Sequence, residues 1–468
     1  MTTIPRYLLA LLMPSLLCIA ASADMPSPRQ VILIIGDGFD DQHVTMGRNY
    51  LAGMSGTLTL DGLPFRGAVQ VETLSPSGQP LYVADSANTA TAIATGTITS
   101  VGRIGTDITD RDLPTIAERA IEAGLRVGLV TTSSITDATP ASFLTHVSSR
   151  NCEGPEEILG STYYGLPQPA CPQDARQNDG PGSIIEQLSV SGAHVLFGGG
   201  QKFLEQITAA GEPVRSLAER NGFRVITDSE ELDKLQTDQA IMGLFASENL
   251  AVRWRGTEGR IAELTETTWL NILSDYLGEA KQPEVMACEP NPEFGTTPAL
   301  ALMTSKALHQ LSSNNPSGFF LMVESASIDK QSHKRNPCGS IGEIEQLEET
   351  LALSLAFASQ HGNTLVIVTA DHAQAAQILP EPSHYEDYPV PIYSPGHTAR
   401  VKTPEGSVMR VNYATNNGFS EEHTGANVPL FANRTDQDSL APFMKQRDLH
   451  GVIADFLLLK RPDERLRD

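Results

Sequence analysis

Unbroken apolar runs alternate along this chain with segments of helical periodicity. The apolar runs cover residues 31–35, 126–132, 193–197, 318–323 and 364–370. Such runs, when they end in turn residues, are typical of strands buried on both faces of a parallel sheet. Helix-like segments fall between them at 86–96, 115–123, 304–312 and 343–361. The alternation predicts an α/β fold, with a mostly parallel, doubly wound sheet between two helical layers.

Three other parts of the chain have weaker patterns. Residues 151–182 are rich in Pro, Gly and Asn and indicate a loop tied by a disulfide. Residues 201–300 predict only short helices and loops. Residues 377–417 contain six prolines and predict a long surface insertion. Because no linker divides the chain, we expect one domain at residues 24–468.

The N-terminus has the pattern of a secretory signal peptide at residues 1–23. Arg6 precedes an apolar stretch at 7–20, and Ala-Ser-Ala follows at 21–23. A lipid anchor on Cys18 is disfavoured, because Leu17 is a poor residue before a lipidated cysteine. We therefore expect export to the periplasm or the medium and no membrane anchor.

Four cysteines remain after the signal peptide, an even number that favours disulfides in an exported protein. Sequence order favours Cys152–Cys171 and Cys288–Cys338, although four cysteines allow three pairings. A zinc site made of cysteines is the alternative, and the absence of a close C-x-x-C pair argues against it.

The formal net charge of −23 disfavours nucleic-acid binding. Salt screens repulsion between surface charges, so a strongly acidic surface is compatible with life at high salt. Halotolerance is therefore one hypothesis, and an ordinary soluble exported protein is the simpler alternative.

Three predicted buried strands end in acidic residues, Asp37, Glu324 and Asp371. The carboxyl ends of parallel strands meet at one sheet edge, where open α/β sheets bind their ligands. A single such residue is most often a surface turn carboxylate. Three together would concentrate negative charge, which requires cations.

Histidines accompany these carboxylates. Asp329 and His333 are four residues apart, a spacing that puts both on one face of a helix. His372 directly follows Asp371, and His423 lies near the C-terminus. Taken one at a time, an exposed ion pair, a structural histidine or a polar loop explains each of them. Together they form a ligand set that suits a borderline divalent metal such as zinc.

Ser86 and Arg150 are candidates for handling a phosphoryl group. Ser86 begins a predicted helix, so it is either a simple N-cap or a nucleophile favoured by the positive helix end. Arg150 can donate two parallel hydrogen bonds to a phosphoryl group. A solvated surface arginine is the alternative.

Six longer motifs carry a specific resemblance. They are IGDG at 35–38, VADSANTATA at 83–92, ITDATPASFLTHVSSRNC at 135–152, FFLMVESASIDKQSHKRNPCG at 319–339, NTLVIVTADHAQAAQI at 363–378 and EEHTG at 421–425. With these motifs in this order, the chain resembles the bacterial exported alkaline phosphatases. The resemblance is weakest at 201–285 and 377–417.

The resemblance implies a three-layer αβα sandwich, a homodimer, and two zinc ions and one magnesium ion per chain. The implied ligands of the first zinc are Asp329, His333 and His423, and those of the second are Asp37, Asp371 and His372. Asp37 would bridge to the magnesium, which Thr139 and Glu324 would also bind. Ser86 would be the nucleophile and Arg150 the phosphate clamp, and Asp137 and Lys330 would lie around the magnesium and the phosphate without binding the metal directly.

The activity that the resemblance implies is hydrolysis of phosphate monoesters to inorganic phosphate and an alcohol. It would pass through a phosphoserine, accept many esters and prefer alkaline pH. A phosphodiesterase or sulfatase on the same scaffold, a metal- or phosphate-binding protein without turnover, and a structural exported domain are the alternatives. A nucleophile beside metal ligands argues against the binding protein, and six metal-type residues in matching contexts argue against the structural domain.

Overall fold

The computed structural model describes residues 28–163, 165–235 and 239–459. Its core is a sheet of ten strands. In spatial order these are β25 (Phe443–Lys445), β2 (Phe65–Gln70), β24 (Val428–Ala432), β18 (Thr364–Ala370), β1 (Arg29–Gly36), β17 (Gly318–Ser325), β5 (Arg126–Ser134), β8 (Val195–Gly199), β10 (Ile241–Leu244) and β9 (Arg224–Ile226). Only β24 runs antiparallel to its neighbours, so the sheet is mostly parallel, as predicted.

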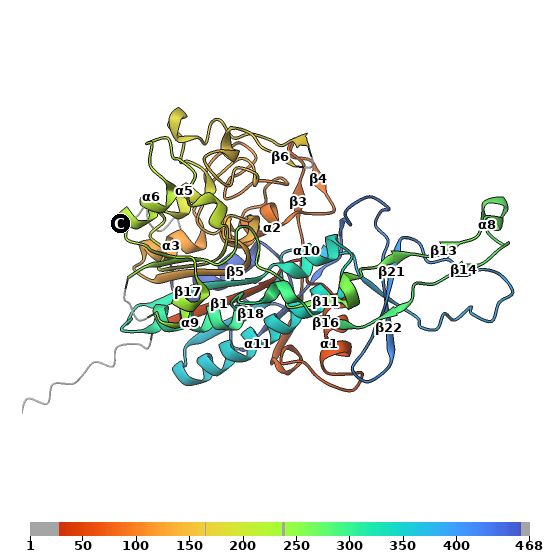
Figure 1. Ribbon diagram of the computed structural model, residues 1–468. Helices are drawn as coiled ribbons and strands as arrows, with labels where there is room; N and C mark the ends of the chain where they lie inside the picture. The colour runs from red at the N-terminus through yellow and green to blue at the C-terminus, as the bar shows by residue number, and fades with distance from the viewer. Residues whose placement is uncertain (1–27, 164, 236–238, 460–468) are drawn as a thin grey trace, which may run out of the picture.

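Helices cover both faces of this sheet (Figure 1). One layer contains α1 (Asp41–Leu51), α9 (Leu300–Ser312) and α11 (Pro337–His361). The other contains α2 (Ser86–Thr95), α3 (Ile116–Glu122), α4 (Ala138–Ala141) and α12 (Asp448–Phe456). Strand β1 lies centrally, and the side chains of its run from Val31 to Ile35 are fully buried. The fold is therefore the predicted α/β sandwich.

Short helices complete the body and connect its layers. They are α5 (Ile184–Leu188), α6 (Val214–Arg220), α7 (Ser229–Asp233) and α10 (Ser327–His333). Helix α10 directly follows β17 and precedes α11, so it sits at the carboxyl edge of the sheet. Both disulfides favoured by sequence order, Cys152–Cys171 and Cys288–Cys338, are present.

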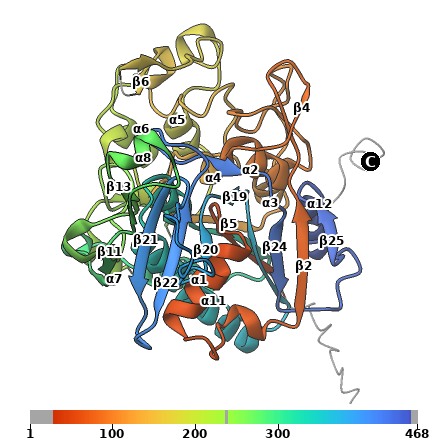
Figure 2. The ribbon, with the colours of Figure 1, turned by 90° about the vertical axis from the view of Figure 1, so that its right-hand side faces the viewer.

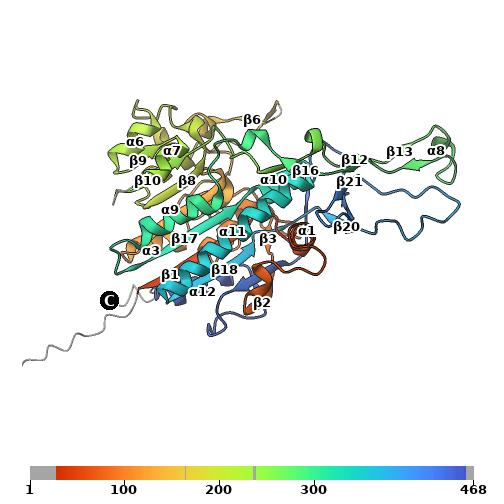
Figure 3. The ribbon, with the colours of Figure 1, turned by 60° about the horizontal axis from the view of Figure 1, so that its bottom comes forward.

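A second, smaller sheet forms the base of an arm that projects from the body (Figures 1 and 3). It contains β12 (Glu263–Leu264), β15 (Val285–Met286), β20 (Gln377–Leu379), β21 (His397–Lys402) and β22 (Val408–Tyr413). Figure 2 shows β21 and β22 side by side in front of the body. Farther out, β13 (Glu266–Thr267) pairs with β14 (Ala280–Lys281), and α8 (Leu270–Leu273) lies between them.

The prediction of only short helices and loops at 201–300 is wrong. Strands β9 and β10 lie in this region and extend the main sheet. They are three and four residues long, too short to give a clear apolar run. The span 377–417, expected as a surface insertion, contains β20, β21 and β22.

Two helices begin earlier than predicted. Helix α9 begins at Leu300 rather than 304, and α11 begins at Pro337 rather than 343. The Asn336 side chain accepts a hydrogen bond from the amide of Gly339, and proline occupies the first turn of α11. Both are start signals of a helix, and the glycines that follow them weaken the helical pattern.

The predicted signal peptide and Cys18 lie outside the described residues. Within the described ranges, no helix combines the length and the apolar character that crossing a membrane requires.

Candidate active site

The acidic strand ends meet at one edge of the sheet. Strand β1 lies between β17 and β18, with Ile35 opposite Glu324 and Gly36 opposite Ala370. Asp37, Glu324 and Asp371 therefore leave neighbouring strands at the same level, and all three are buried. This convergence is the arrangement that the parallel-strand pattern predicted.

Asp37, Asp371 and His372 form one cluster, in which their candidate ligand atoms lie within 4.8 Å of one another. His372 Nε2 is 3.4 Å from both Asp37 Oδ1 and Asp371 Oδ2. Burial raises the pKa of Asp37, and the charge of Asp371 raises it further. Burial lowers the pKa of His372, which favours its neutral form. Two carboxylates and a neutral imidazole are a ligand set for a divalent cation.

The Asp37 turn depends on Gly38, which has a φ of +67°. Its amide donates to Asp371 Oδ1 at 3.0 Å. A Cβ at this position would lie 3.0 Å from the Cβ atoms of Asp329 and Gln374. Only glycine combines this left-handed backbone with so close an approach.

Asp329, His333 and His423 form a second cluster. Helix α10 places Asp329 and His333 one turn apart, with His333 Nε2 at 3.3 Å from Asp329 Oδ2. His423 Nε2 lies 3.4 Å from Asp329 Oδ1 and 3.1 Å from His333 Nε2. His372 stacks on His423, so the two clusters adjoin. Burial opposes ionisation of Asp329, but the two histidines lower its pKa well below the usual range.

The hydrogen bonds that Nδ1 makes in His333 and in His423 determine the tautomer of each ring. His333 Nδ1 donates to the carbonyl of Glu421, and His423 Nδ1 donates to the carbonyl of Ala84 at 2.8 Å. A carbonyl oxygen only accepts, so the proton lies on Nδ1 in each neutral ring. Both Nε2 lone pairs then face Asp329, as they do in histidines that bind a metal.

Glu324 and Thr139 lie at the third candidate cation site. Glu324 Oε2 accepts hydrogen bonds from Thr131 and Ser133. Among the described residues, Glu324 Oε1, Thr139 Oγ1 and Asp371 Oδ2 are buried and have no hydrogen-bond partner. Burial and the nearby charge of Asp137 raise the pKa of Glu324 to about 7. Buried oxygens without partners are costly, and a bound cation would satisfy them.

Ser86 lies at the first residue of α2, beside the Asp37 cluster. Asp85 caps this helix in a reciprocal pair of hydrogen bonds with Asn88. Ser86 Oγ is 3.0 Å from His372 Nε2 and 3.5 Å from Asp37 Oδ1. The helix N-terminus and any cation at the cluster would both favour an alkoxide at Ser86.

Arg150 and Lys330 share the carboxylate of Asp137. Arg150 Nη2 contacts Asp137 at 2.9 Å, and Lys330 Nζ donates to the other oxygen. Burial opposes the charge of Asp137, but Lys330 and Arg150 lower its pKa. The carboxylate raises the pKa of both bases against the effect of burial. All three groups therefore stay charged, and the guanidinium is held in place.

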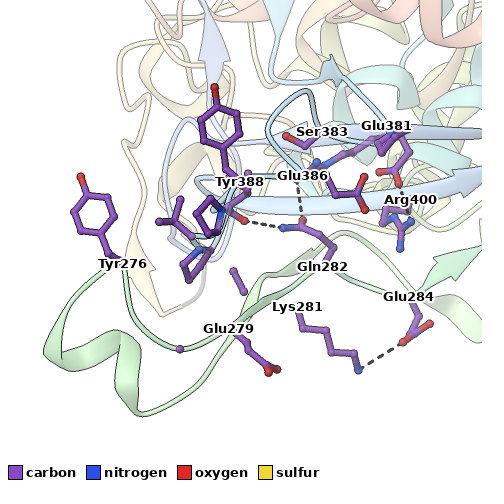
Figure 4. Close-up of a pocket in the computed structure, with 18 residues that line it drawn as sticks. Tyr276, Glu279, Lys281, Gln282, Glu284, Glu381, Ser383, Glu386, Tyr388 and Arg400 are labelled. Atoms are coloured by element: carbon purple, nitrogen blue, oxygen red, sulfur yellow. Dashed lines mark hydrogen bonds and ion pairs between the residues drawn. The ribbon is translucent and has the colours of Figure 1, made fainter.

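One cavity of about 1120 Å³ opens onto part of this site. Its lining includes Ser86, Arg150, Asp329, His333 and His423. A second cavity of about 660 Å³ lies in the arm, between the loops that carry Gln282 and Tyr388 (Figure 4). None of the residues predicted to act in the site lines this second cavity.

Sequence reasoning missed two supporting residues. Asp85 Oδ2 accepts a hydrogen bond from Arg150 Nη1 at 3.3 Å, and Gln374 Nε2 donates to Asp329 Oδ1 at 2.6 Å. Adjacency to Ser86 was a usable signal for Asp85. Gln374 faces the site because β19 (Ala373–Gln374) pairs with β23 (His423–Thr424), a contact without a local signal.

Adjoining cation clusters, a serine at a helix start and a fixed arginine at the edge of an α/β sheet define a class of protein, the metal-dependent phosphoryl hydrolases. A family model described as alkaline phosphatase matches residues 28–426. The chain belongs to the alkaline phosphatase family.

Relatives and solved structures agree with this family. The chain is 38% identical to the alkaline phosphatase of Escherichia coli (strain K12) over 448 residues, covering 94% of this chain and 88% of that protein. It is 37% identical to the streptomycin-6-phosphate phosphatase of Streptomyces griseus, covering 93% and 92%. The alkaline phosphatase of the Antarctic bacterium TAB5 has the same fold, with a TM-score of 0.66, 22% identity and coverage of 93% and 100%.

Proposed function

We propose that Ser86 is the nucleophile with which this alkaline phosphatase hydrolyses phosphate monoesters, and that Arg150 holds the phosphoryl group. The observation that carries the proposal is the position of Ser86 Oγ. It lies 3.0 Å from His372, in the cavity that Arg150 also lines. The phosphoenzyme is then a phosphoserine at residue 86.

The donor sets support two zinc ions and one magnesium ion per chain. Asp329, His333 and His423 would hold one zinc, and Asp37, Asp371 and His372 the other, because carboxylates with imidazoles suit this metal. Glu324 and Thr139, with Asp37 as a bridge, form an all-oxygen set that suits magnesium. When bound, such cations stabilise charge on phosphoryl oxygens and lower the pKa of a coordinated hydroxyl or water.

The remaining steps depend on side chains of the protein itself. Ser86 Oγ loses its proton to solvent and attacks phosphorus in line, the bond to the ester oxygen breaks, and the alcohol leaves with a proton from solvent. Water then attacks the phosphoserine, the bond to Ser86 Oγ breaks, and inorganic phosphate is released. Arg150 donates to equatorial oxygens, where charge spreads in the transition state. Asp137 and Asp85 fix the plane of its guanidinium, so little ordering remains at the moment of reaction.

A dianionic substrate must approach a protein with a formal charge of −23. Arg150 and Lys330 are held in their charged forms, and three divalent cations, when bound, would outweigh the charges of Asp37, Glu324, Asp329 and Asp371. The cavity would then be cationic within an acidic surface. Alkaline pH favours the serine alkoxide and hydroxide, so we expect the activity to rise with pH.

Monoesters are favoured over diesters and sulfate esters, because the fixed positive charge of Arg150 matches a dianion. One relative carries the name of a single bulky substrate, but the proposed mechanism needs little contact with the leaving group. We propose broad use of small-molecule phosphate monoesters in the periplasm or the medium, without nucleic-acid-specific binding and without a membrane anchor.

We also propose a homodimer, and the arm supports it. Trp269, Ile272, Leu273, Tyr276 and Leu277 expose between 49% and 87% of their surface near its tip. Tyr385 and Tyr388 of the adjoining loop are also exposed, and their rings contact each other edge to face. Large exposed apolar groups that gather in one part of the surface mark interaction sites. Light scattering tests this: Ile272→Ser with Trp269→Ser should lower the mass to that of a monomer, while Leu159→Ser on the body leaves it unchanged.

The catalytic proposal is tested with p-nitrophenyl phosphate. We expect Ser86→Ala to abolish turnover and phosphoenzyme trapping while its zinc content stays that of wild type. Ser354→Ala is the matched control, because this serine is buried in α11 and donates only to the carbonyl of Thr350. Wild-type turnover by Ser86→Ala would refute the nucleophile. Full activity after chelation, without added zinc and magnesium, would refute the cation sites.

A further inference from the structure

The cavity at the site extends beyond the groups that handle phosphate. Its volume of about 1120 Å³ matches or exceeds that of pockets that enclose a drug-sized ligand, about 300–1,000 Å³. The additional wall is mostly polar, with one aromatic ring. It contains Asn291, Gln331, Lys334, Asn336 and Phe419.

Phe419 exposes 79% of its surface and sits on a tightly held loop. Glu421 anchors this loop, because its carboxylate accepts hydrogen bonds from Arg335 Nε at 2.6 Å and from Thr415 Oγ1 at 2.7 Å. Asn416 closes the turn by accepting from the amide of Gly418 and donating to the carbonyl of Ser420. The backbone under Phe419 is therefore fixed while the ring faces solvent and cavity. A large exposed ring on a fixed loop is a preorganised contact surface.

The position of this loop relates it to the departing alcohol. In an in-line displacement the attacking and leaving oxygens lie on opposite sides of phosphorus. Ser86 Oγ contacts His372 and Asp37, so the leaving oxygen faces the cluster that contains His333. Ser420 Oγ lies 3.3 Å from His333 Nδ1. Phe419 directly precedes Ser420 in the chain and lines the same cavity, on its leaving-group side.

We infer that Phe419 is a specificity-determining residue that stacks on a planar ring in the leaving group, which favours nucleoside 5′-monophosphates over esters of small alcohols. The inference rests on the proposed function of Ser86. Stacking of a base on an aromatic side chain is sequence-tolerant, because every base has a π-face.

The test compares adenosine 5′-monophosphate with glycerol 2-phosphate in the metal-loaded Phe419→Ala enzyme. We expect KM for the nucleotide to rise about tenfold, which corresponds to about 1.4 kcal/mol. The kcat should not change, because the ring contributes equally to binding of the substrate and of the transition state. The leaving group has also departed before the phosphoserine is hydrolysed. The KM for glycerol 2-phosphate and inhibition by inorganic phosphate should also stay at wild-type values.

Three further measurements complete the test. Phe419→Trp should restore the nucleotide KM, and Phe443→Ala, at another exposed phenylalanine, should leave it unchanged. Calorimetry with the Ser86→Ala holoenzyme should show weaker binding of the nucleotide, without weaker binding of inorganic phosphate, once Phe419→Ala is added. An equal loss for both esters, or a change in oligomeric mass in Phe419→Ala, would overturn the inference. Turnover by Ser86→Ala would instead refute the nucleophile, so the two failures are distinct.

Discussion

The buried ion pair between Arg335 and Glu421 yields a quantitative prediction. The Arg335 and Glu421 side chains expose only 8% and 0% of their surface. The same stretch of backbone supports the site, because the amide of Glu421 donates to the carbonyl of His333 at 3.0 Å. The pair thus joins the end of α10 to the loop that precedes His423.

Removing one partner should cost more than removing both. Arg335→Met leaves the Glu421 carboxylate buried without its cation, which destabilises a protein by about 3–5 kcal/mol. Glu421→Gln leaves the Arg335 guanidinium buried without its anion. The double variant buries neither unpaired charge, so we expect a coupling energy of about 2 kcal/mol in the double-mutant cycle. An unbranched side chain is chosen at 335 because Arg335 has a φ of 58°.

The pH dependence gives an independent check. Burial opposes ionisation of Glu421, but Thr415 and Arg335 lower its pKa. A lowered folded-state pKa stabilises the fold above the unfolded value of 4.5, and this contribution is lost as the pH falls through the folded value. Without Arg335 the carboxyl is protonated more readily. The difference in stability between Arg335→Met and wild type should therefore shrink on acidification.

Chemical denaturation of the metal-loaded variants measures these free energies of unfolding. Arg260→Met is the matched control, because Arg260 pairs with Glu263 at 2.8 Å on a more exposed surface and should lose at most about 1 kcal/mol. A coupling below about 0.5 kcal/mol, within the usual error of additivity, would refute the reasoning. So would a loss in Arg335→Met no larger than in the control.

Three further predictions concern separate parts of the molecule. Replacing Cys288 and Cys338 by alanine opens a crosslink between residues 50 apart and should lower stability by about 4 kcal/mol on the chain-entropy estimate; an unchanged denaturation midpoint would contradict it. Burial lowers the pKa of His146, but its contact with Glu118 at 2.9 Å raises it overall, and the same contact lowers the pKa of Glu118 against the effect of burial. The contribution of His146 to stability is complete below its unfolded-state pKa of 6.5 and is lost as the pH rises through its folded-state pKa. The contribution of Glu118 is present above its unfolded-state pKa of 4.5 and is lost as the pH falls through its folded-state pKa. His146→Gln should therefore cost about 1–2 kcal/mol near pH 5.5 and less near pH 9, and denaturation curves with an equal loss at both pH values would exclude this pair as the cause. Glu324→Gln keeps the shape of the side chain but removes its charge, so the magnesium concentration for half-maximal activity should rise at least about tenfold; a titration that matches wild type would remove Glu324 from the magnesium site.

Much of the fold was readable in the sequence because its signals are local. Strand β18 has the predicted bounds, 364–370, and β1 adds only a few residues to its predicted apolar run. The spacing of Asp329 and His333 placed both on one helical face, and the acidic residues after three apolar runs indicated one sheet edge. In each case a short segment carries both its conformation and the direction of its side chains.

Partner choice between distant segments had to come from the tertiary structure. Strands β10 and β9 are too short to carry a pattern. They exist because β8 offers hydrogen bonds to β10, and β10 offers them to the edge strand β9. Neither Arg335 nor Glu421 signals its partner, 86 residues away, and nothing local places Ser420 against His333. The sequence by itself determined the central strands and several of the long helices, and which residues have the chemistry of a cation site. Only the three-dimensional packing decided which of them touch, because the energy of a buried contact depends on both partners and on the water that they exclude.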